Sequence, residues 1–441
     1  QLNRCLFESK CGGANRSWDF EFVDKEDNDN LLFRFVYVKN KSISETRKIL
    51  NKNEIERPIS QSSNHLCQTF HGNTITTCKY LKSSKYLLTG AEDTQLIISK
   101  ITNDKNSVNL IHEFHLQGHD SVVKCIDYYE LNENEMLLVS AGGKANIKIW
   151  KVFLNENSQH NDSVNISRIT NLYEFKRKLS QNKKNLNNSK NEKPWLYVDL
   201  KSNPDIRFMD VCMFRSDLTN DDAILCFACS DGCIRIFRYS VETNKLYLVS
   251  KYEYPKCLLC IRKLKIRINS IDRNYLLAFG TDGNLLFWKI NESDNEKPQI
   301  IEKLNQSGIN DVDIWQFSES NQAIMATVGD DTCLTLTKIE VDQNENLNTM
   351  SNLIKFEMIH SSAIVGVKFI LENFLATVSK DQRLIVWEID YKAKMIKPVK
   401  VYFINVPDVS SMDLKILEKD SIFQFLVVGV GMEIINFKLE K

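Results

Sequence analysis

Two cysteine pairs have the spacing of a metal site. Cys226-x-x-Cys229 is followed by Cys257-x-x-Cys260. Four thiolates at this spacing can bind a structural zinc ion when a turn separates the two members of each pair. Both pairs, however, fall in apolar runs that predict strands, where residues three apart point to opposite faces. We therefore expect reduced, buried thiols, as in cytosolic or nuclear proteins, and zinc binding is the alternative.

A basic segment offers a second chemistry, the binding of phosphate groups. Residues 175–193, FKRKLSQNKKNLNNSKNEK, hold seven basic residues against one acid and show no apolar periodicity. This composition predicts a mobile loop. The candidates for RNA contact are Arg177, Lys178, Lys183 and Lys184. A solvated insertion without function is the alternative that we favour, because no aromatic residue follows Phe175 in the cluster to stack on bases.

Motifs for catalysis are absent from the sequence. It has no G-x-x-x-x-G-K-[ST] phosphate loop, no G-x-G-x-x-G opening a helix, no G-x-S-x-G elbow and no H-E-x-x-H. Lys plus Arg equals Asp plus Glu at 57 each, so no net charge points to nucleic acid or an anionic membrane. No apolar run approaches the roughly 20 residues of a membrane span. We expect a protein that is not an enzyme and that has no cofactor, metal or membrane partner.

The elements that carry these residues come from an internal repeat. LATVSKDQRLIVW (375–387) reads as two short strands joined by a tight turn. The same template recurs with its turn at Asp93, Lys144, Asp231, Asp282, Asp331, Asp381 and Gly431. Five of the six gaps between these turns lie within one residue of 50. A repeat of this length holds four short strands, one blade of a β-propeller, so seven turns predict seven blades.

An N-terminal strand is expected to complete the last blade and close the ring, because little sequence follows Phe437. The candidate strands are 31–38 (LLFRFVYV) and 18–22 (WDFEF). Loss of residues 1–40 is then expected to destabilise the whole ring.

The domain assignment follows from this closure. We assign residues 1–66 to the ring-closing strand or strands and a linker. Residues 67–441 form an all-β, seven-bladed propeller with a disordered basic insertion at about 153–195. Residue 1 is Gln rather than Met, and we expect the chain to be part of a longer protein.

The blade residues resemble those of WD40 propellers. In that family a His before the first strand, a Ser or Thr, an Asp in the turn and a Trp form one hydrogen-bonded set. His360, Thr377, Asp381 and Trp387 match all four positions. The resemblance implies a structural role for these residues, not a catalytic one. It also implies that residues just before each turn Asp form a partner-binding rim, and from fold geometry we select Glu92, Asp330 and Lys380.

The order of distinctive stretches resembles a narrower family. SAGGKANIKIW (140–150) and NPDIRFMD (203–210) are similar to the C-terminal propeller of the WD-repeat subunit that partners an FtsJ-type tRNA 2′-O-ribose methyltransferase. The resemblance covers most of residues 70–437.

This second resemblance implies a non-catalytic, cytoplasmic subunit preceded by further propellers. It would bind the methyltransferase as a heterodimer and help to position tRNA for ribose methylation of the wobble nucleotide. S-adenosylmethionine would be bound by the catalytic partner. The alternative is a general WD40 interaction scaffold in trafficking or ubiquitin-ligase assembly, because the fold alone does not choose among these roles.

Overall fold

The chain divides into two compact units, Gln1–Ser63 and Asn64–Lys441, which we describe separately. The computed structural model describes residues 18–24, 30–39, 42–51, 64–67, 70–81, 85–104, 107–132, 135–156, 164–175, 206–216, 222–268, 271–290, 298–317, 320–344, 346–418 and 422–439. Within these ranges, no helix has the length and hydrophobicity that a membrane crossing requires.

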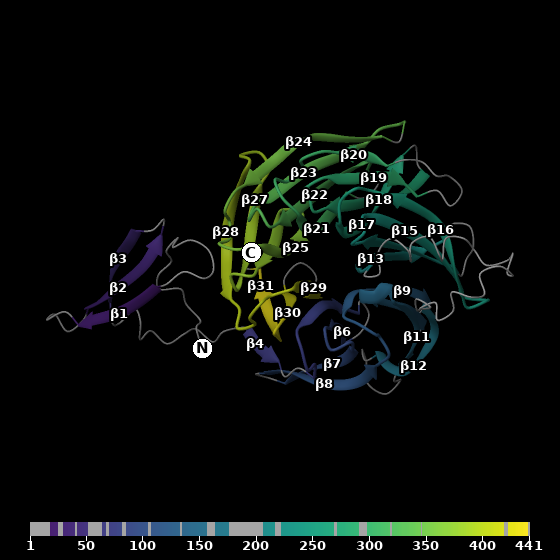
Figure 1. The fold of residues 1–441 in the computed structure, drawn as a ribbon, viewed down its shortest axis with the longest axis horizontal. Helices are drawn as coiled ribbons and strands as arrows, with labels where there is room; N and C mark the ends of the chain where they lie inside the picture. The colour runs from purple at the N-terminus through teal and green to yellow at the C-terminus, as the bar shows by residue number, and fades with distance from the viewer. Residues whose placement is uncertain are drawn as a thin grey trace, which may run out of the picture. The chain divides into compact units, whose positions relative to one another are not determined.

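The first unit contains a three-stranded antiparallel sheet, drawn in purple in Figure 1. Its strands are β1 (Trp18–Asp24), β2 (Asn30–Lys39) and β3 (Ser42–Asn51), in that order. Because side chains alternate along a strand, Phe33, Phe35 and Tyr37 share one face of β2. Their rings contact in series, with centroids 6.3 and 5.5 Å apart. On the other face Arg34 forms ion pairs with Glu21 at 2.6 Å and with Glu45 at 2.8 Å.

The second unit is a ring of seven four-stranded antiparallel sheets (Figure 1). Blade 1 consists of β5 (Ile75–Tyr80), β6 (Tyr86–Ala91), β7 (Leu96–Asp104) and β8 (Ser107–Leu116). Blade 2 consists of β9 (Val123–Asn132), β10 (Glu135–Gly142), β11 (Ile147–Glu156) and β12 (Val164–Phe175), with a short 3-10 turn, η1 (Gly143–Ala145), between β10 and β11. Blade 3 consists of β13 (Phe208–Arg215), β14 (Ala223–Cys229), β15 (Cys233–Ser240) and β16 (Lys245–Glu253).

The remaining blades repeat this meander. Blade 4 consists of β17 (Leu258–Ile268), β18 (Ile271–Gly280), β19 (Leu285–Lys289) and β20 (Gln299–Ile301). Blade 5 consists of β21 (Ile309–Gln316), β22 (Gln322–Gly329), β23 (Leu334–Val341) and β24 (Leu347–Phe356). Blade 6 consists of β25 (Ile364–Leu371), β26 (Phe374–Ser379), β27 (Arg383–Asp390) and β28 (Met395–Phe403). Blade 7 consists of β29 (Ser411–Glu418), β30 (Ile422–Gly429), β31 (Gly431–Lys438) and β4 (Asn64–Cys67).

The first strand of each blade lies innermost and contacts the first strands of both neighbouring blades. This series runs from β5 through β9, β13, β17, β21, β25 and β29 and returns to β5. Apolar side chains fill the space between successive blades, so each sheet buries both faces only because it has two neighbours. The all-β, seven-bladed fold predicted from the repeat is confirmed.

An N-terminal strand closes the ring, as predicted, but both named candidates for it were wrong. The closing strand is β4, which pairs with β31 from Met432↔Cys67 to Ile435↔Asn64. Residues 31–38 and 18–22 lie in β2 and β1, which satisfy each other's backbone groups in the separate sheet. Four residues are too few to show a period-2 pattern, so no pattern in the sequence indicates β4. Loss of residues 64–67, rather than of 1–40, is therefore expected to open the ring.

Part of the expected insertion is regular structure. Residues 164–175 form β12, the outer strand of blade 2, and pair with β11. Residues 176–205, which include Arg177, Lys178, Lys183 and Lys184, lie outside the described residues.

Candidate partner-binding rim and channel

A four-residue hydrogen-bonded set holds the turn of blade 6. His360 Nδ1 lies 3.1 Å from both carboxylate oxygens of Asp381, and Nε2 lies 2.9 Å from the Thr377 hydroxyl. Trp387 Nε1 donates to the same hydroxyl at 2.9 Å. An Nδ1–H donating to the carboxylate leaves Nε2 to accept from Thr377, so this buried polar group is satisfied. The set fixes the turn between Lys380 and Arg383.

The turn carboxylate of blade 6 stays charged to low pH. Burial opposes the charge of Asp381, but hydrogen bonds from His360 and Arg383 outweigh it and hold the pKa well below its usual range. Arg383 Nη2 lies 2.7 Å from Asp381 Oδ2. The Ser361 backbone N–H also donates to this oxygen, at 2.9 Å.

Blade 1 has three of the four residues of this set. His71 Nδ1 lies 3.0 Å from Asp93 Oδ2, and His71 Nε2 lies 2.9 Å from the Thr89 hydroxyl. Ser99, at the usual Trp position, is 2% exposed. The histidine and carboxylate therefore hold the turn without the indole donor.

Blade 2 keeps the His and Trp contacts but has a lysine at the turn. His119 Nε2 lies 2.8 Å from Ser140 Oγ, to which Trp150 Nε1 donates at 3.0 Å. Lys144, in the position of the Asp, adopts a left-handed backbone conformation with φ of 56° and is exposed. Lys148 donates instead to the Gln117 carbonyl at 3.3 Å, and its ammonium lies over the Trp150 ring.

The other blades lack the histidine and have other polar pairs near the turn. The pairs are Asp231 with Arg235, Asp282 with Tyr254, Thr327 with Asn305, and Glu433 with Asn405. Each pair satisfies a buried or half-buried polar group at the same end of the blade. All seven turns are therefore anchored at one end of the ring, where the rim was predicted.

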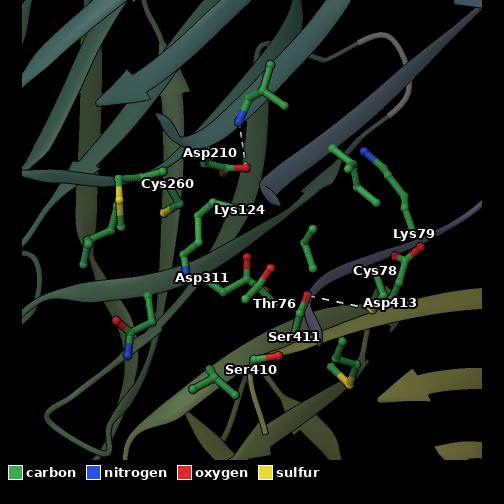
Figure 2. Close-up of a pocket in the computed structure, with 18 of the residues that line it drawn as sticks. Thr76, Cys78, Lys79, Lys124, Asp210, Cys260, Asp311, Ser410, Ser411 and Asp413 are labelled. Atoms are coloured by element: carbon green, nitrogen blue, oxygen red, sulfur yellow. Dashed lines mark hydrogen bonds between the residues drawn. The ribbon is translucent and has the colours of Figure 1, made fainter. Parts of the chain in front are cut away.

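A cavity of about 630 Å³ lies on the axis of the ring and is lined by residues of all seven inner strands. Figure 2 shows Lys124, Asp210, Asp311 and Asp413 around it. The lining includes eight carboxylates and five cationic side chains. This excess of negative charge disfavours entry of a phosphate group and favours a basic one.

The three predicted rim residues all line this cavity. Glu92, Asp330 and Lys380 each precede a turn Asp, and the backbone N–H of each bonds across to the loop before the blade's inner strand. Asn310 Nδ2 donates to Asp330 Oδ1 at 2.8 Å, and Lys380 Nζ lies 3.2 Å from Asp408 Oδ1. The structure thus places these residues at one opening of the channel.

Carboxylates on the inner strands join successive blades. Each accepts a backbone N–H from the inner strand of the next blade. The pairs are Asp127 with Met213 at 2.7 Å, Asp210 with Ile261 at 3.0 Å, Asp311 with Val367 at 3.0 Å, Asp313 with Phe369 at 2.7 Å and Asp413 with Tyr80 at 2.7 Å. The last pair bridges blades 7 and 1, so these bonds help to hold the ring closed.

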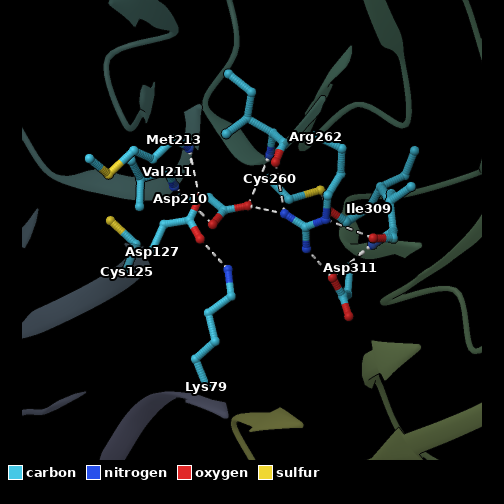
Figure 3. A network of polar contacts seen from close by, with 12 residues as sticks. Lys79, Cys125, Asp127, Asp210, Val211, Met213, Cys260, Arg262, Ile309 and Asp311 are labelled. Atoms are coloured by element: carbon cyan, nitrogen blue, oxygen red, sulfur yellow. Dashed lines mark hydrogen bonds and ion pairs between the residues drawn. The ribbon is translucent and has the colours of Figure 1, made fainter. Parts of the chain in front are cut away.

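Cations in the channel neutralise several of these carboxylates (Figure 3). Arg262 lies 2.5 Å from both Asp210 and Asp311, and its Nε donates to the Val312 carbonyl at 2.8 Å. One side chain of blade 4 therefore contacts blades 3 and 5. Lys79 of blade 1 forms an ion pair with Asp127 of blade 2 in the same way.

The pKa shifts in the channel reflect competition between burial and charge. Burial opposes the charge of Arg262, but Asp210 and Asp311 outweigh it and hold the pKa well above its ordinary value. Burial raises the pKa of the Asp313 carboxyl. Burial lowers the pKa of the Lys124 ammonium, and repulsion from Lys380 adds to this effect. An anion that approaches Lys124 would therefore stabilise the charged form of its ammonium.

The cysteine pairs lie on strands or beside one and are held in the core. Cys226 packs between blades 3 and 4, whereas Cys229 packs between blades 2 and 3. Cys260 is buried between blades 4 and 5, and Cys257 immediately precedes β17. Burial raises the pKa of the Cys229 thiol to about 12. In the part of the chain that the structure describes, no three His, Cys, Asp or Glu side chains are grouped to hold a metal ion.

Comparisons with known proteins give a fold and distant relatives. The model of the family "WD domain, G-beta repeat" matches residues 109–151. The structure titled "Crystal structure of RRP9 WD40 repeats" has a TM-score of 0.53 at 14% identity and covers 84% of this chain and 96% of its own. "Crystal structure of WD40 beta propeller domain of Doa1" has a TM-score of 0.52 at 12% identity, with coverages of 86% and 98%. The fold is therefore that of WD40 propellers.

The sequence relatives share one description. The mouse protein "tRNA (34-2'-O)-methyltransferase regulator WDR6" is 20% identical over 97% of this chain and 42% of its own length. The human protein of the same name is 20% identical over 54% of this chain and 24% of its own length. The chain thus spans less than half the length of these relatives and is distantly similar to them.

Proposed function

We propose that this chain is a non-catalytic scaffold for an S-adenosylmethionine-dependent tRNA 2′-O-methyltransferase, acting in the cytoplasm. The supporting observation is the similarity to the mouse methyltransferase regulator, which extends over 97% of the chain. In this proposal the enzyme supplies both the cofactor site and the catalytic groups. The propeller holds the enzyme and helps to place the wobble nucleotide of the tRNA at its active site.

The acidic part of the rim is the proposed contact with the enzyme. Glu92 and Asp330 stand at the channel opening, and Asp408 lies beside them with Lys380 as its partner. The backbone N–H of Glu92 and that of Asp330 are bonded to the loop before the inner strand, so the backbone positions that carry these carboxylates are fixed relative to one another. An acidic surface next to an acidic channel fits a basic patch on a protein partner.

The first test is affinity purification of the tagged protein followed by mass spectrometry. The proposal requires an FtsJ-type methyltransferase to copurify at a one-to-one ratio. It fails if coat proteins or ubiquitin-ligase subunits copurify instead. The reconstituted pair should then methylate the ribose of nucleotide 34 in tRNA when S-adenosylmethionine is added.

Charge reversal of the rim tests the proposed contact. The double variant Glu92→Lys with Asp330→Lys should reduce capture of the methyltransferase at least tenfold. The matched control, Glu372→Lys with Glu388→Lys, changes the charge equally at exposed positions of blade 6 away from the channel. Equal capture by both double variants would exclude the rim as the contact.

A further inference from the structure

A second charged surface lies on the same end of the ring and carries the opposite sign. It consists of Lys144, Arg207 and Lys256, with Lys124 at the channel edge, and we call it the basic arc. Lys144 is in the turn of blade 2, Arg207 directly precedes β13 and Lys256 lies two residues before β17. The antiparallel meander places these turns and strand entries at one end of blades 2, 3 and 4.

Backbone hydrogen bonds link the arc into one continuous surface. Ala145 N donates to the Ile206 carbonyl at 2.9 Å, which puts Lys144 beside the entry of blade 3. Arg207 N donates to Ser230 Oγ at 2.9 Å, so Arg207 is anchored to the turn of its own blade.

The same kind of link continues to blade 4. Tyr254 N donates to the Gly232 carbonyl at 2.9 Å, which connects the turn of blade 3 to the segment that holds Lys256. A Cβ on Gly232 would meet the Tyr254 carbonyl at 2.0 Å and the Lys256 carbonyl at 2.8 Å. This close approach fixes the Lys256 backbone against blade 3.

Lys144 gives the clearest sign that the arc serves something other than the fold. It occupies the turn position where five other blades place an Asp, and it has a left-handed backbone conformation that is disfavoured for residues with a Cβ. Gly143 N to the Val122 carbonyl at 3.0 Å and the Ala145 bond hold the turn in place without it. The lysine side chain is exposed and gives up the capping role that the carboxylate has elsewhere.

The cations of the arc are available to an outside anion. Lys144, Arg207 and Lys256 are exposed, and within the described ranges none of them has an ion pair or a side-chain hydrogen bond. The carboxylates Asp231 and Asp210 in this region are engaged by Arg235 and Arg262. A run of separated cations carried on fixed backbone positions suits a ligand with repeated negative charges better than a single small anion.

We propose that the basic arc binds the phosphate backbone of an RNA strand that runs over blades 2 to 4 outside the channel. The proposal rests on the proposed function, since tRNA is the substrate that the scaffold would present. The acidic channel keeps the strand on the outer surface, and the acidic rim on blades 1, 5 and 7 stays free for the enzyme. Contacts to phosphates carry no sequence information, so the arc would position RNA without reading it.

The test measures tRNA affinity by fluorescence anisotropy over a range of salt concentrations, with the whole chain. The arc variant is Lys144→Gln, Arg207→Gln and Lys256→Gln together. Loss of three phosphate contacts should reduce the slope of log affinity against log salt by about 2, and affinity at low salt should fall at least tenfold. The loss should be the same for tRNAs of different sequence.

Two further variants make the result specific. Lys392→Gln, Lys394→Gln and Lys397→Gln remove the same charge from exposed positions at the outer edge of blade 6 and should leave the slope unchanged. Lys144→Arg, Arg207→Lys and Lys256→Arg keep the charge and should bind like the unaltered chain. An arc variant that binds tRNA as the control does overturns the proposal, and so does an arc variant that loses a protein partner while keeping tRNA.

Failure of this inference is separable from failure of the proposed function. Methyltransferase capture is measured on the same arc variant and should be unchanged. If the unaltered chain captures no methyltransferase but shows the arc-dependent salt slope, the scaffold role fails and the RNA surface stands. If capture is normal and the slope does not depend on the arc, only the RNA surface fails.

Discussion

Replacement of Arg262 tests whether channel charges hold the ring together. Arg262 joins Asp210 of blade 3 to Asp311 of blade 5, with 2.5 Å to each. Arg262→Gln removes the positive charge and the guanidinium N–H donors. Both carboxylates then face the channel without the Arg262 cation. Each carboxylate still accepts a backbone N–H from the next blade, from Ile261 and Val367. The variant therefore loses the cation and its contacts with Asp210, Asp311 and Val312, whereas the backbone N–H bonds to the two carboxylates remain.

The magnitude follows from the exposure of the pair. Breaking a fully buried ion pair costs about 3–5 kcal/mol, whereas an exposed pair contributes about 0–1 kcal/mol. The Arg262 side chain is 26% exposed and the Asp311 side chain 12%, so channel water can solvate part of the uncompensated charge. We expect the free energy of unfolding to fall by about 2–3 kcal/mol, between the two limits.

The assay is urea unfolding followed by tryptophan fluorescence, with Lys265→Gln as the control. Lys265 is on the same strand and pairs with Asp272, but its side chain is 55% exposed, so its loss should cost no more than about 0.5 kcal/mol. The double variant Arg262→Gln with Asp311→Asn should be less destabilised than the two single variants predict by addition, because it removes the uncompensated charge. Equal effects of Arg262→Gln and Lys265→Gln would refute the reasoning.

Other contacts of the ring give three further predictions. Trp387→Phe removes the donor to Thr377 and should lower the free energy of unfolding by about 1 kcal/mol, measured by urea unfolding; no change would mean that water replaces the indole. The pKa of Asp381 is lower in the folded state than in the unfolded state. The charged carboxylate therefore contributes to stability above the unfolded-state pKa of about 4, and this contribution is lost as the pH falls through the folded-state pKa. Asp381→Asn should therefore be less stable than the unaltered chain at pH 7 and lose less stability on acidification, as thermal unfolding at several pH values can show. A chain that begins at residue 52 keeps β4 and should keep the thermal midpoint of the propeller. A chain that begins at residue 70 lacks β4 and should unfold at a temperature several degrees lower. Equal thermal midpoints for the two chains would contradict the role of β4 in ring closure.

The repeat made the blades predictable because the turns have strict local chemistry. Asp381 with Arg383, or Asp282 with Asn284, caps a tight turn between two apolar strands, and such a pattern is visible in one sequence. The ring closure was not predictable in the same way. β4 pairs with β31 across nearly the whole chain, and nothing in Asn64–Cys67 distinguishes it from a loop. The role of β4 follows from its position in the chain just before β5, and a search for residue patterns does not take that position into account.

The inner-strand charges were missed although the sequence holds a signal for them. Asp127, Asp210, Arg262, Asp311 and Asp413 each interrupt the apolar inner strand of their blade, at one of two positions that lie two residues apart. A charged residue inside an apolar strand of an open sheet would be a defect. In a closed ring the same positions face a water-accessible axis and reach the next blade, so the signal becomes meaningful only after closure is recognised. The repeat therefore had to be assigned before these residues could be interpreted.

Rigid inter-blade bonds matter for function because the rim and the basic arc lie on different blades. Glu92 and Asp330 are on blades 1 and 5, Lys144 is in the turn of blade 2 and Lys256 precedes the first strand of blade 4. If blades moved independently, two partners on one end of the ring would not keep a fixed distance from each other. The carboxylate bonds from each inner strand to the next resist such motion. Loosening the ring with Arg262→Gln should then reduce methylation by the assembled complex more than it reduces binding of either partner alone, because presentation of a nucleotide to an active site tolerates little displacement.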